Sequence, residues 1–167
     1  MAIRDVLVYP DPRLKQISSP VTKFDSALQD FIRDLNDTML AGPGCVGIAA
    51  PQVGHFERIV IVDLTSKPKN PNHGKLVLIN PVIVESSGEK IGREGCLSVP
   101  DYTGNIVRAK NITLSAYDEE GNPQSYEMKG FEARVAQHEI DHLDGRLFLD
   151  RLVCRRSELF PRQNYAE

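Results

Sequence analysis

The amino-acid sequence predicts an α+β fold in which short, mostly antiparallel sheets surround a central metal-binding helix. Three observations support this prediction: an amphipathic stretch near the N-terminus, a series of short β-branched segments separated by turn signals, and a late helical segment with two histidines four residues apart. The chain has 167 residues and shows no internal repeat and no long linker. We therefore expect residues 1–167 to form a single catalytic domain.

The first helix is predicted over residues 25–40. Apolar side chains recur in this stretch at intervals of three and four, as they do on one face of an α-helix. They are Phe24, Leu28, Phe31, Ile32, Leu35 and Met39. The sequence Gly-Pro-Gly at residues 42–44 is a helix stop. We expect this helix to pack against the core.

Five short segments have the composition of strands, because they are rich in β-branched residues and bounded by turn residues. They are residues 58–64, 76–79, 82–85, 111–117 and 124–128. Turn signals separate them at Asn80-Pro81, at Ser87-Gly88 and at residues 120–123. We expect the strands to be mostly antiparallel.

The second long helix is predicted to begin near Gly130 and to end near Gly145. His138 and His142 lie four residues apart on it, about 400° of helical turn, so both imidazoles project from one face and can bind the same ion. Glu139 lies about 100° around the helix from His138, where it can contact a water molecule beside the ion. This spacing is typical of catalytic metal sites in hydrolases, in which the glutamate acts as general base and acid.

A catalytic site of this kind needs a third protein ligand and one open position for water. A metzincin-like sequence would have a histidine where Phe148 stands, and a thermolysin-like site would need a later glutamate, of which only Glu158 and Glu167 are present. Upstream, Cys96 precedes a turn-prone Ser-Val-Pro segment, where a thiolate could face the helix.

Two alternatives stay open on this evidence. The first is a zinc peptidase that uses both histidines and Glu158. The second is a structural zinc module in which Cys96 and the histidines are joined by a fourth ligand, either Cys45 or Cys154, because closed structural sites have four protein ligands.

The composition is that of an ordinary globular protein, with 41% hydrophobic and 26% charged residues and a net charge of −3. No apolar run approaches the roughly 18 residues of a membrane span, and the N-terminus lacks the features of a signal or transit peptide. Three widely spaced cysteines do not suggest a disulfide framework. We therefore expect a cytoplasmic protein without a membrane or specific DNA partner.

Three separated motifs resemble those of the peptide deformylase family. They are the stretch 45–52, which ends in Ala-Ala-Pro-Gln, the sequence Glu-Gly-Cys-Leu-Ser at residues 94–98, and His-Glu-x-x-His at residues 138–142. Their order and spacing fit the family, and the early Tyr-Pro-Asp-Pro at residues 9–12 is also similar, so the resemblance covers nearly the whole chain. The first motif departs from the family at Cys45, where glycine is usual. This side chain either narrows the substrate groove or is accommodated by a re-routed loop at residues 42–44.

The resemblance implies an enzyme that removes the formyl group from the N-terminal formyl-methionine of nascent polypeptides and releases formate. It implies metal ligation by Cys96, His138 and His142. It also implies that the Gln52 side-chain amide and the Leu97 backbone N–H stabilise the negative charge that grows on the carbonyl oxygen. Composition alone would place Gln52 on the surface, since glutamine is mostly exposed.

The substrate is expected to contact residues from the first two motifs and from the metal-binding helix. They are Val46, Gly47, Ile48, Glu94, Gly95, Phe131 and Val135. The nascent peptide is expected to lie as an added strand against Val46, Gly47 and Gly95. Phe131 and Val135 continue the ligand face of the helix, where they either wall an apolar substrate pocket or belong only to the core.

Two carboxylates beside the ligands need partners. By analogy with the family, Glu94 is expected to pair with Arg108, because a carboxylate next to a metal ligand is costly unless paired. Asp141 either orients an imidazole or a backbone group, or is a solvated helix charge.

Thiolate and imidazole ligands suit one divalent ion of zinc, iron, cobalt or nickel. The resemblance implies Fe(II) in the cell, with Zn, Co or Ni possible in purified protein.

Arginines also concentrate near the C-terminus: Arg146, Arg151, Arg155, Arg156 and Arg162. On a short helix Arg151, Arg155 and Arg162 would form a basic stripe. This stripe is either solvated surface or, as the resemblance implies, a weak contact with the ribosome.

Overall fold

The structure is a computed structural model that describes residues 3–152 and 159–162. It contains two α-helices, three 3-10 helices (η) and eight strands within these residues. In chain order they are η1 (Pro12–Lys15), α1 (Ser26–Ala41), β1 (Gly47–Ala49), η2 (Ala50–Val53), β2 (Ile59–Asp63), β3 (Lys75–Ser87), β4 (Lys90–Cys96), β5 (Val99–Arg108), β6 (Asn111–Tyr117), β7 (Pro123–Lys129), α2 (Gly130–Leu143), η3 (Phe148–Arg151) and β8 (Leu159–Pro161).

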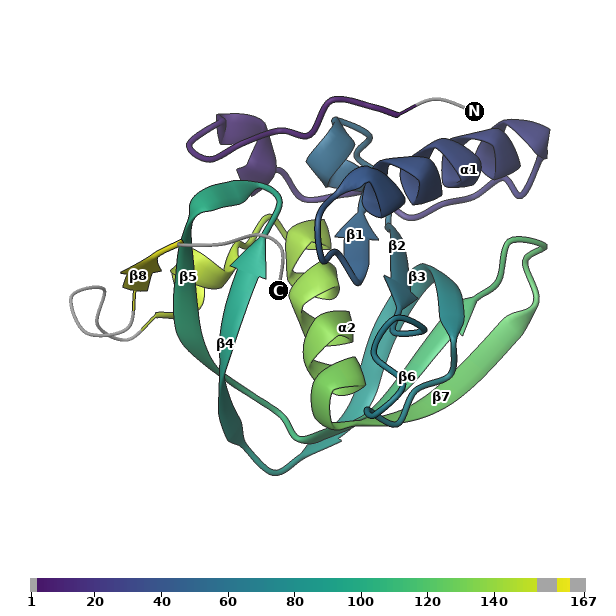
Figure 1. Cartoon of the computed structure of the whole chain (residues 1–167). Helices are drawn as coiled ribbons and strands as arrows, with labels where there is room; N and C mark the ends of the chain where they lie inside the picture. Colours follow the sequence, from purple (N-terminus) through teal and green to yellow (C-terminus); the bar gives the residue numbers. More distant parts are fainter. Residues whose placement is uncertain (1–2, 153–158, 163–167) are drawn as a thin grey trace.

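The described strands form two antiparallel sheets, and the predicted α+β fold is confirmed. One sheet has the order β1-β2-β3-β6-β7, and the other has the order β4-β5-β8. Helix α2 lies between the two sheets, with α1 on the far side of β1 and β2 (Figure 1). The helix that carries the histidines is therefore central, as the sequence predicts.

Strand β2 shows how the five-stranded sheet is held between the helices. Its residues alternate between two hydrophobic clusters: Val60 and Val62 pack with α2, whereas Ile59 and Ile61 pack with α1. All four side chains are fully buried. Because successive side chains of a strand point to opposite faces, this run of four apolar residues contributes to the hydrophobic core on both faces of the sheet.

Both predicted helices are confirmed, with small shifts at their ends. Helix α1 begins after Asp25, whose carboxylate accepts a hydrogen bond from the Leu28 backbone N–H at 3.0 Å and so caps the helix. Helix α2 ends at Leu143, two residues before the predicted end, and Gly145 follows with a φ of 73°. Within the described residues, no helix is long and apolar enough to cross a membrane.

The prediction of separate strands at 76–79 and 82–85 is wrong, because both segments belong to β3. The register shifts between Ile79 and Val82, so the strand bends instead of ending. Asn80 takes a φ of 52°, and its amide accepts a hydrogen bond from the Val21 N–H and donates one to the Val21 carbonyl. The Asn-Pro signal therefore marks a bulge that is anchored to the N-terminal segment.

Arg151 and Arg162 do not share a helix, although the predicted basic stripe requires it. Arg151 ends η3, and Arg162 follows β8, a strand that pairs with β5. Arg155 and Arg156 lie outside the described residues. The backbone at Arg162 is thus held by a sheet rather than by a helix.

Candidate metal centre

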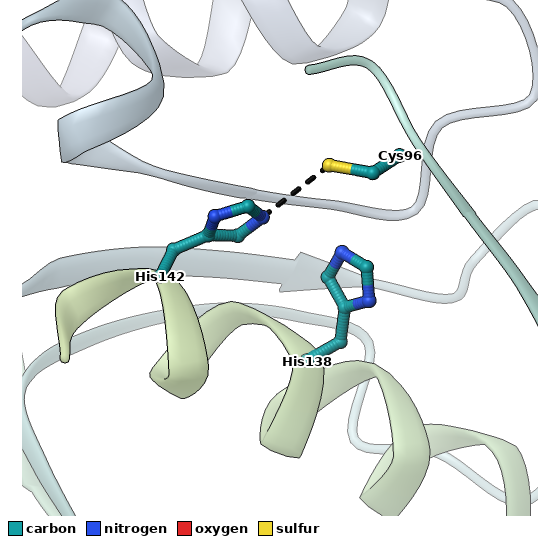
Figure 2. Close-up of side chains that lie close together, drawn as sticks. All are labelled: Cys96, His138 and His142. Carbon is teal, nitrogen blue, oxygen red and sulfur yellow. Dashed lines mark hydrogen bonds between the residues drawn. The ribbon is translucent and has the colours of Figure 1, made fainter. Parts of the chain in front are cut away.

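Cys96, His138 and His142 converge between the two sheets. Their ligand atoms all lie within 4.8 Å of one another, and all three residues are buried. Cys96 ends β4, and the histidines project from one face of α2 toward it, with Cys96 Sγ 3.3 Å from His142 Nε2 (Figure 2). One sulfur and two nitrogens at this spacing form a three-ligand metal site.

The donor set fits a catalytic ion better than a structural one. Among the described residues the cluster has three ligands, one fewer than a closed structural site, and two of them, Cys96 and His138, line a pocket that would give water access to a bound ion. Cys45 does not join it, because its thiol donates to the Gly47 carbonyl at 3.0 Å. Cys154 and Glu158, the other alternative ligands, lie outside the described residues.

The Glu94 carboxylate orients the first histidine. Glu94 Oε1 accepts a hydrogen bond from His138 Nδ1 at 2.8 Å, which leaves Nε2 of that imidazole for the ion. Arg108 donates to both carboxylate oxygens, at 2.9 and 2.8 Å, as predicted. Arg134 adds a third contact at 2.6 Å. Burial alone would raise the pKa of Glu94, but the hydrogen bonds from Arg108 and His138 hold it well below its usual range.

Asp141 extends this network on the side away from the pocket. It is buried and accepts hydrogen bonds from Arg108 Nη1 at 2.6 Å and from Arg151 Nη2 at 2.7 Å. The prediction of a solvated helix charge is therefore wrong. Asp141 holds Arg108, which holds Glu94, so it acts on the imidazole only through two other side chains.

Glu139 is buried beside the ligands and faces the pocket. Its Oε1 has no hydrogen-bond partner among the described residues, and its Oε2 lies close to the backbone of Gly47. Burial raises the pKa of Glu139 to about 7. A buried carboxyl group with such a pKa can both accept and release a proton near neutral pH.

Gln52 is buried, contrary to the expectation from composition. Its Oε1 accepts a hydrogen bond from the Ala49 N–H at 2.9 Å, and its Nε2 donates to Ser98 Oγ at 3.1 Å and lies 3.4 Å from Cys96 Sγ. The amide is thus fixed with its donor group next to the ligand sulfur. Ser98, which helps to fix it, was not among the predicted site residues.

A pocket of about 210 Å³ opens beside the three ligands. Val46, Gly47, Glu94, Gly95, Phe131 and Val135 line it, together with Gln52 and Leu97. Ile48 does not, because its side chain is fully buried in the cluster around α1. The expected contact of Ile48 with the substrate stays a prediction, and a buried side chain leaves only the backbone of Ile48 for it.

Three arginines at this pocket were not predicted: Arg93, Arg134 and Arg162. Arg134 had a sequence signal, since it stands four residues before His138 and so shares the ligand face of α2. No sequence pattern indicated Arg162, because it follows β8, far along the chain from Gly95, and only the fold brings its guanidinium to Gly95. A Cβ at Gly95 would clash with Nη2 of Arg162.

The fold and the Cys-His-His centre define a metal-dependent hydrolase. A family model described as polypeptide deformylase matches residues 3–158. Peptide deformylase 2 of Vibrio cholerae is 47% identical over 95% of this chain and 92% of its own length. A crystal structure of a peptide deformylase from Legionella pneumophila has a TM-score of 0.84 and 44% identity, and the match covers 90% of this chain and 86% of that one.

A second similar structure is a class I type b peptide deformylase from Acinetobacter baumannii with Met-Ala-Ser bound. It has a TM-score of 0.84 and 35% identity, and the match covers 90% of this chain and 99% of that one. The chain belongs to the polypeptide deformylase family. Its activity is the metal-dependent removal of the N-formyl group, at the site formed by Cys96, His138 and His142.

Proposed function

We propose that this enzyme acts on the formyl-methionine of nascent polypeptides and binds the peptide as a strand between β1 and β4. The observation that carries the proposal is a pair of strand edges on opposite sides of the pocket. Within the described residues, β1 pairs only with β2, and β4 pairs only with β5. Gly47 of β1 and Gly95 of β4 line the pocket. An extended peptide between these edges can use their backbone groups.

The methionine side chain of the substrate is assigned to the apolar wall beside α2. Phe131 and Val135 line the pocket from α2, about two turns and one turn before His138, respectively. Val46 and Leu97 line it from the regions of the two strands. Such a wall favours an unbranched thioether side chain, which adapts to an irregular apolar surface. The Met-Ala-Ser complex of the Acinetobacter baumannii relative supports a substrate of this kind.

The chain supplies the proton transfer and the charge stabilisation. A divalent metal ion, when bound by Cys96, His138 and His142, provides Lewis acidity and lowers the pKa of water at the open position. Glu139 accepts the proton of the attacking water and passes it to the departing amine. The Gln52 amide and the Leu97 N–H donate to the formyl oxygen as it becomes negative. The fixed orientation of Gln52 supports this role.

Glu94 is assigned a positioning role rather than contact with the substrate. It lines the pocket, but its carboxylate is fully occupied by His138, Arg108 and Arg134. Its proposed task is therefore to keep Nδ1 of His138 protonated and Nε2 directed at the ion.

Iron(II) is proposed as the ion in the cell, with Zn, Co or Ni as occupants of the purified protein. The thiolate and imidazole donors suit all four. An Fe(II)–thiolate centre that borders an open pocket is prone to oxidation at its cysteine, which favours a reducing compartment, and we propose the cytoplasm.

A weak ribosome contact through the C-terminal arginines is a separate proposal. Arg146 is exposed, but Arg151 is committed to Asp141 and Arg162 lines the pocket. Co-sedimentation with ribosomes at low salt tests it: loss of pelleting in an Arg146→Gln variant supports the contact, and an unchanged amount in the pellet contradicts it.

The proposed function is tested by release of formate from formyl-Met-Ala-Ser. The enzyme is loaded with Fe(II) without oxygen, and formate and bound metal are measured in the same sample. We expect turnover of the formyl peptide and none of acetyl-Met-Ala-Ser, because the extra methyl group does not fit the end of the pocket at the ligands. Equal turnover of both peptides, or none of either with the metal in place, would contradict the proposal.

A further inference from the structure

A second cleft continues the metal pocket along the free edge of β4. It is lined by Lys67, Asn70 and Pro71 from the loop before β3, by Lys90 and Gly92 from β4, and by Lys110 before β6. It shares Arg93, Phe131 and Arg134 with the metal pocket. We call it the lysine cleft, after Lys67, Lys90 and Lys110.

All the charged residues that line the lysine cleft are cationic. No aspartate or glutamate is among the described residues that line it. In the described part of the chain, none of the three lysines takes part in an ion pair. Lys90 and Lys110 are exposed and Lys67 is half-buried, so their ammonium groups are accessible. A concave surface with charges of one sign concentrates ligands of the opposite sign.

Other contacts hold both shared arginines in place, and only Arg134 is paired with a carboxylate, whereas Arg93 keeps its charge. Arg134 donates to the Glu94 carboxylate at 2.6 Å and to the Lys90 carbonyl at 2.6 Å. Arg93 donates to Asn105 and lies over the ring of Phe160, 3.8 Å from its centroid. An anion in the cleft would therefore meet the three lysines and Arg93.

The direction of β4 connects the cleft to the substrate. The strand runs from Lys90, in the cleft, to Cys96, at the metal site. A peptide with its formyl end at Cys96 that pairs with the β4 edge therefore runs antiparallel to β4, toward Lys90. Gly95 and Lys90 are five positions apart, about 17 Å in a strand. The peptide side chains near Lys90 are then those of about the fourth to sixth residues.

We propose that the lysine cleft is a subsite for acidic side chains at about the fourth to sixth residues of the formylated substrate. The inference rests on the proposed function, because it needs the peptide to lie along β4. It adds a preference among nascent chains: those with aspartate or glutamate soon after the formyl-methionine are processed fastest. Lysine ammonium groups on flexible stems suit this task, since they meet carboxylates in several positions without a fixed geometry.

The test compares two formylated hexapeptides, formyl-Met-Ala-Ser-Glu-Glu-Glu and formyl-Met-Ala-Ser-Lys-Lys-Lys, by kcat/KM at low salt. We expect the full-length metal-loaded enzyme to prefer the acidic peptide by about tenfold, given several partly exposed ion pairs. A Lys67→Gln/Lys90→Gln/Lys110→Gln variant should reduce this ratio to about twofold or less. Raising the salt concentration should reduce it as well, because exposed charges are screened. The readout is the ratio of the two kcat/KM values, so a general loss of activity in the variant lowers both values and leaves the ratio unchanged.

A charge-matched control is a Lys23→Gln/Lys69→Gln/Lys75→Gln variant. These lysines are exposed and do not line the cleft, although Lys69 lies in the same loop as Lys67. We expect this variant to retain the full preference. Equal kcat/KM values for the two hexapeptides would overturn the inference. It would also be overturned if the preference remained in the cleft-lysine variant and disappeared in the control-lysine variant.

Two further outcomes separate the possible failures. Formyl-Met-Ala-Ser is too short to reach Lys90, so its turnover reports the proposed function alone. Turnover of this tripeptide with equal rates for the two hexapeptides overturns only the lysine cleft subsite. Binding of a short RNA that depends on Lys67, Lys90 and Lys110, without any preference between the peptides, would assign the cleft to phosphate groups and also overturn it.

Discussion

The carboxylate of Glu94 lies 2.8 Å from Nδ1 of His138, and this contact ties one metal ligand to the strand that carries another, Cys96. Glu94 is in β4, two residues before the ligand Cys96, whereas His138 is in α2. Arg108 of β5 and Arg134 of α2 hold the same carboxylate. The network therefore fixes the distance between strand and helix on which the three-ligand geometry depends.

Replacing Glu94 by alanine should damage both the stability and the metal site. Removal of one partner of a buried ion pair costs about 3–5 kcal/mol of unfolding free energy, because Arg108 remains buried without its carboxylate. Loss of the acceptor for His138 should also lower metal affinity about 10- to 100-fold. Denaturant unfolding and metal titration measure the two effects. Glu89→Ala, at an exposed position near the start of β4, is the control and should change neither. Wild-type metal affinity in a folded Glu94→Ala protein would contradict the positioning role.

Replacing Glu139 by glutamine should separate metal binding from catalysis. The amide keeps the shape of the side chain but cannot accept the proton of the attacking water, so turnover should fall about 100-fold or more. Metal content should remain that of the wild type, because Glu139 is not among the three ligands. Formate release and metal analysis on one sample check both points, with Glu127→Gln at an exposed site of β7 as the control. An active Glu139→Gln enzyme would remove this residue from the mechanism.

Replacing Cys96 by alanine should lower metal content and activity together. Three ligands become two, and the remaining histidines hold a divalent ion more weakly. Cys45→Ala is the matched control, since Cys45 is near the pocket but its thiol donates to the Gly47 carbonyl instead of joining the ligand cluster. Full metal occupancy in Cys96→Ala would point to a different third ligand.

The thiol of Cys45 should be unreactive in the folded enzyme. Burial raises its pKa to about 12, so the thiol stays protonated at pH 8 and forms the reactive thiolate only as the pH approaches that value. Alkylation by iodoacetamide at pH 8 should therefore be about 100-fold slower than that of a free thiol, or slower still. Peptide mapping by mass spectrometry measures the rate at this position. The same protein in denaturant is the control and should react at the ordinary rate, and fast labelling of the folded enzyme would contradict the burial of this group.

The elements that the sequence predicts well are those with a local signal. Residues 111–117 alternate in burial as a half-covered strand does, and the helices carry apolar faces and end signals. By contrast, β4 was missed, because it contains Gly92 and Gly95 and several charged residues and has low strand propensity. Its strand form depends on pairing with β5 and on the Arg134 contact with the Lys90 carbonyl. Such long-range contacts leave no periodic pattern in the sequence.

The candidate site also contains residues with a local sequence signal and residues that only long-range contacts place there. The spacing of His138 and His142 predicts a shared ion because a helix is a regular object. The burial of Gln52 could not be predicted from its residue type, since it depends on Ser98 and Cys96, more than 40 residues away. The position of Arg162 over Gly95 likewise depends on the pairing of β8 with β5.

The close approach of β1 to α2 gives the last prediction. A Cβ at Gly47 would lie 2.7 Å from Oε2 of Glu139 and 2.9 Å from Cγ1 of Val135, both shorter than a normal contact. Gly47→Ala should therefore displace the Glu139 carboxylate and lower kcat about 100-fold, while the metal content stays unchanged. The double variant Gly47→Ala/Val135→Ala is the control: it relieves the contact with Val135 but not the one with Glu139, so its activity should stay low. Recovery of activity in the double variant would show that the alanine at position 47 acts through Val135 and not through Glu139. Wild-type turnover of the Gly47→Ala enzyme would contradict the prediction, because it would show that displacement of the Glu139 carboxylate does not impair catalysis.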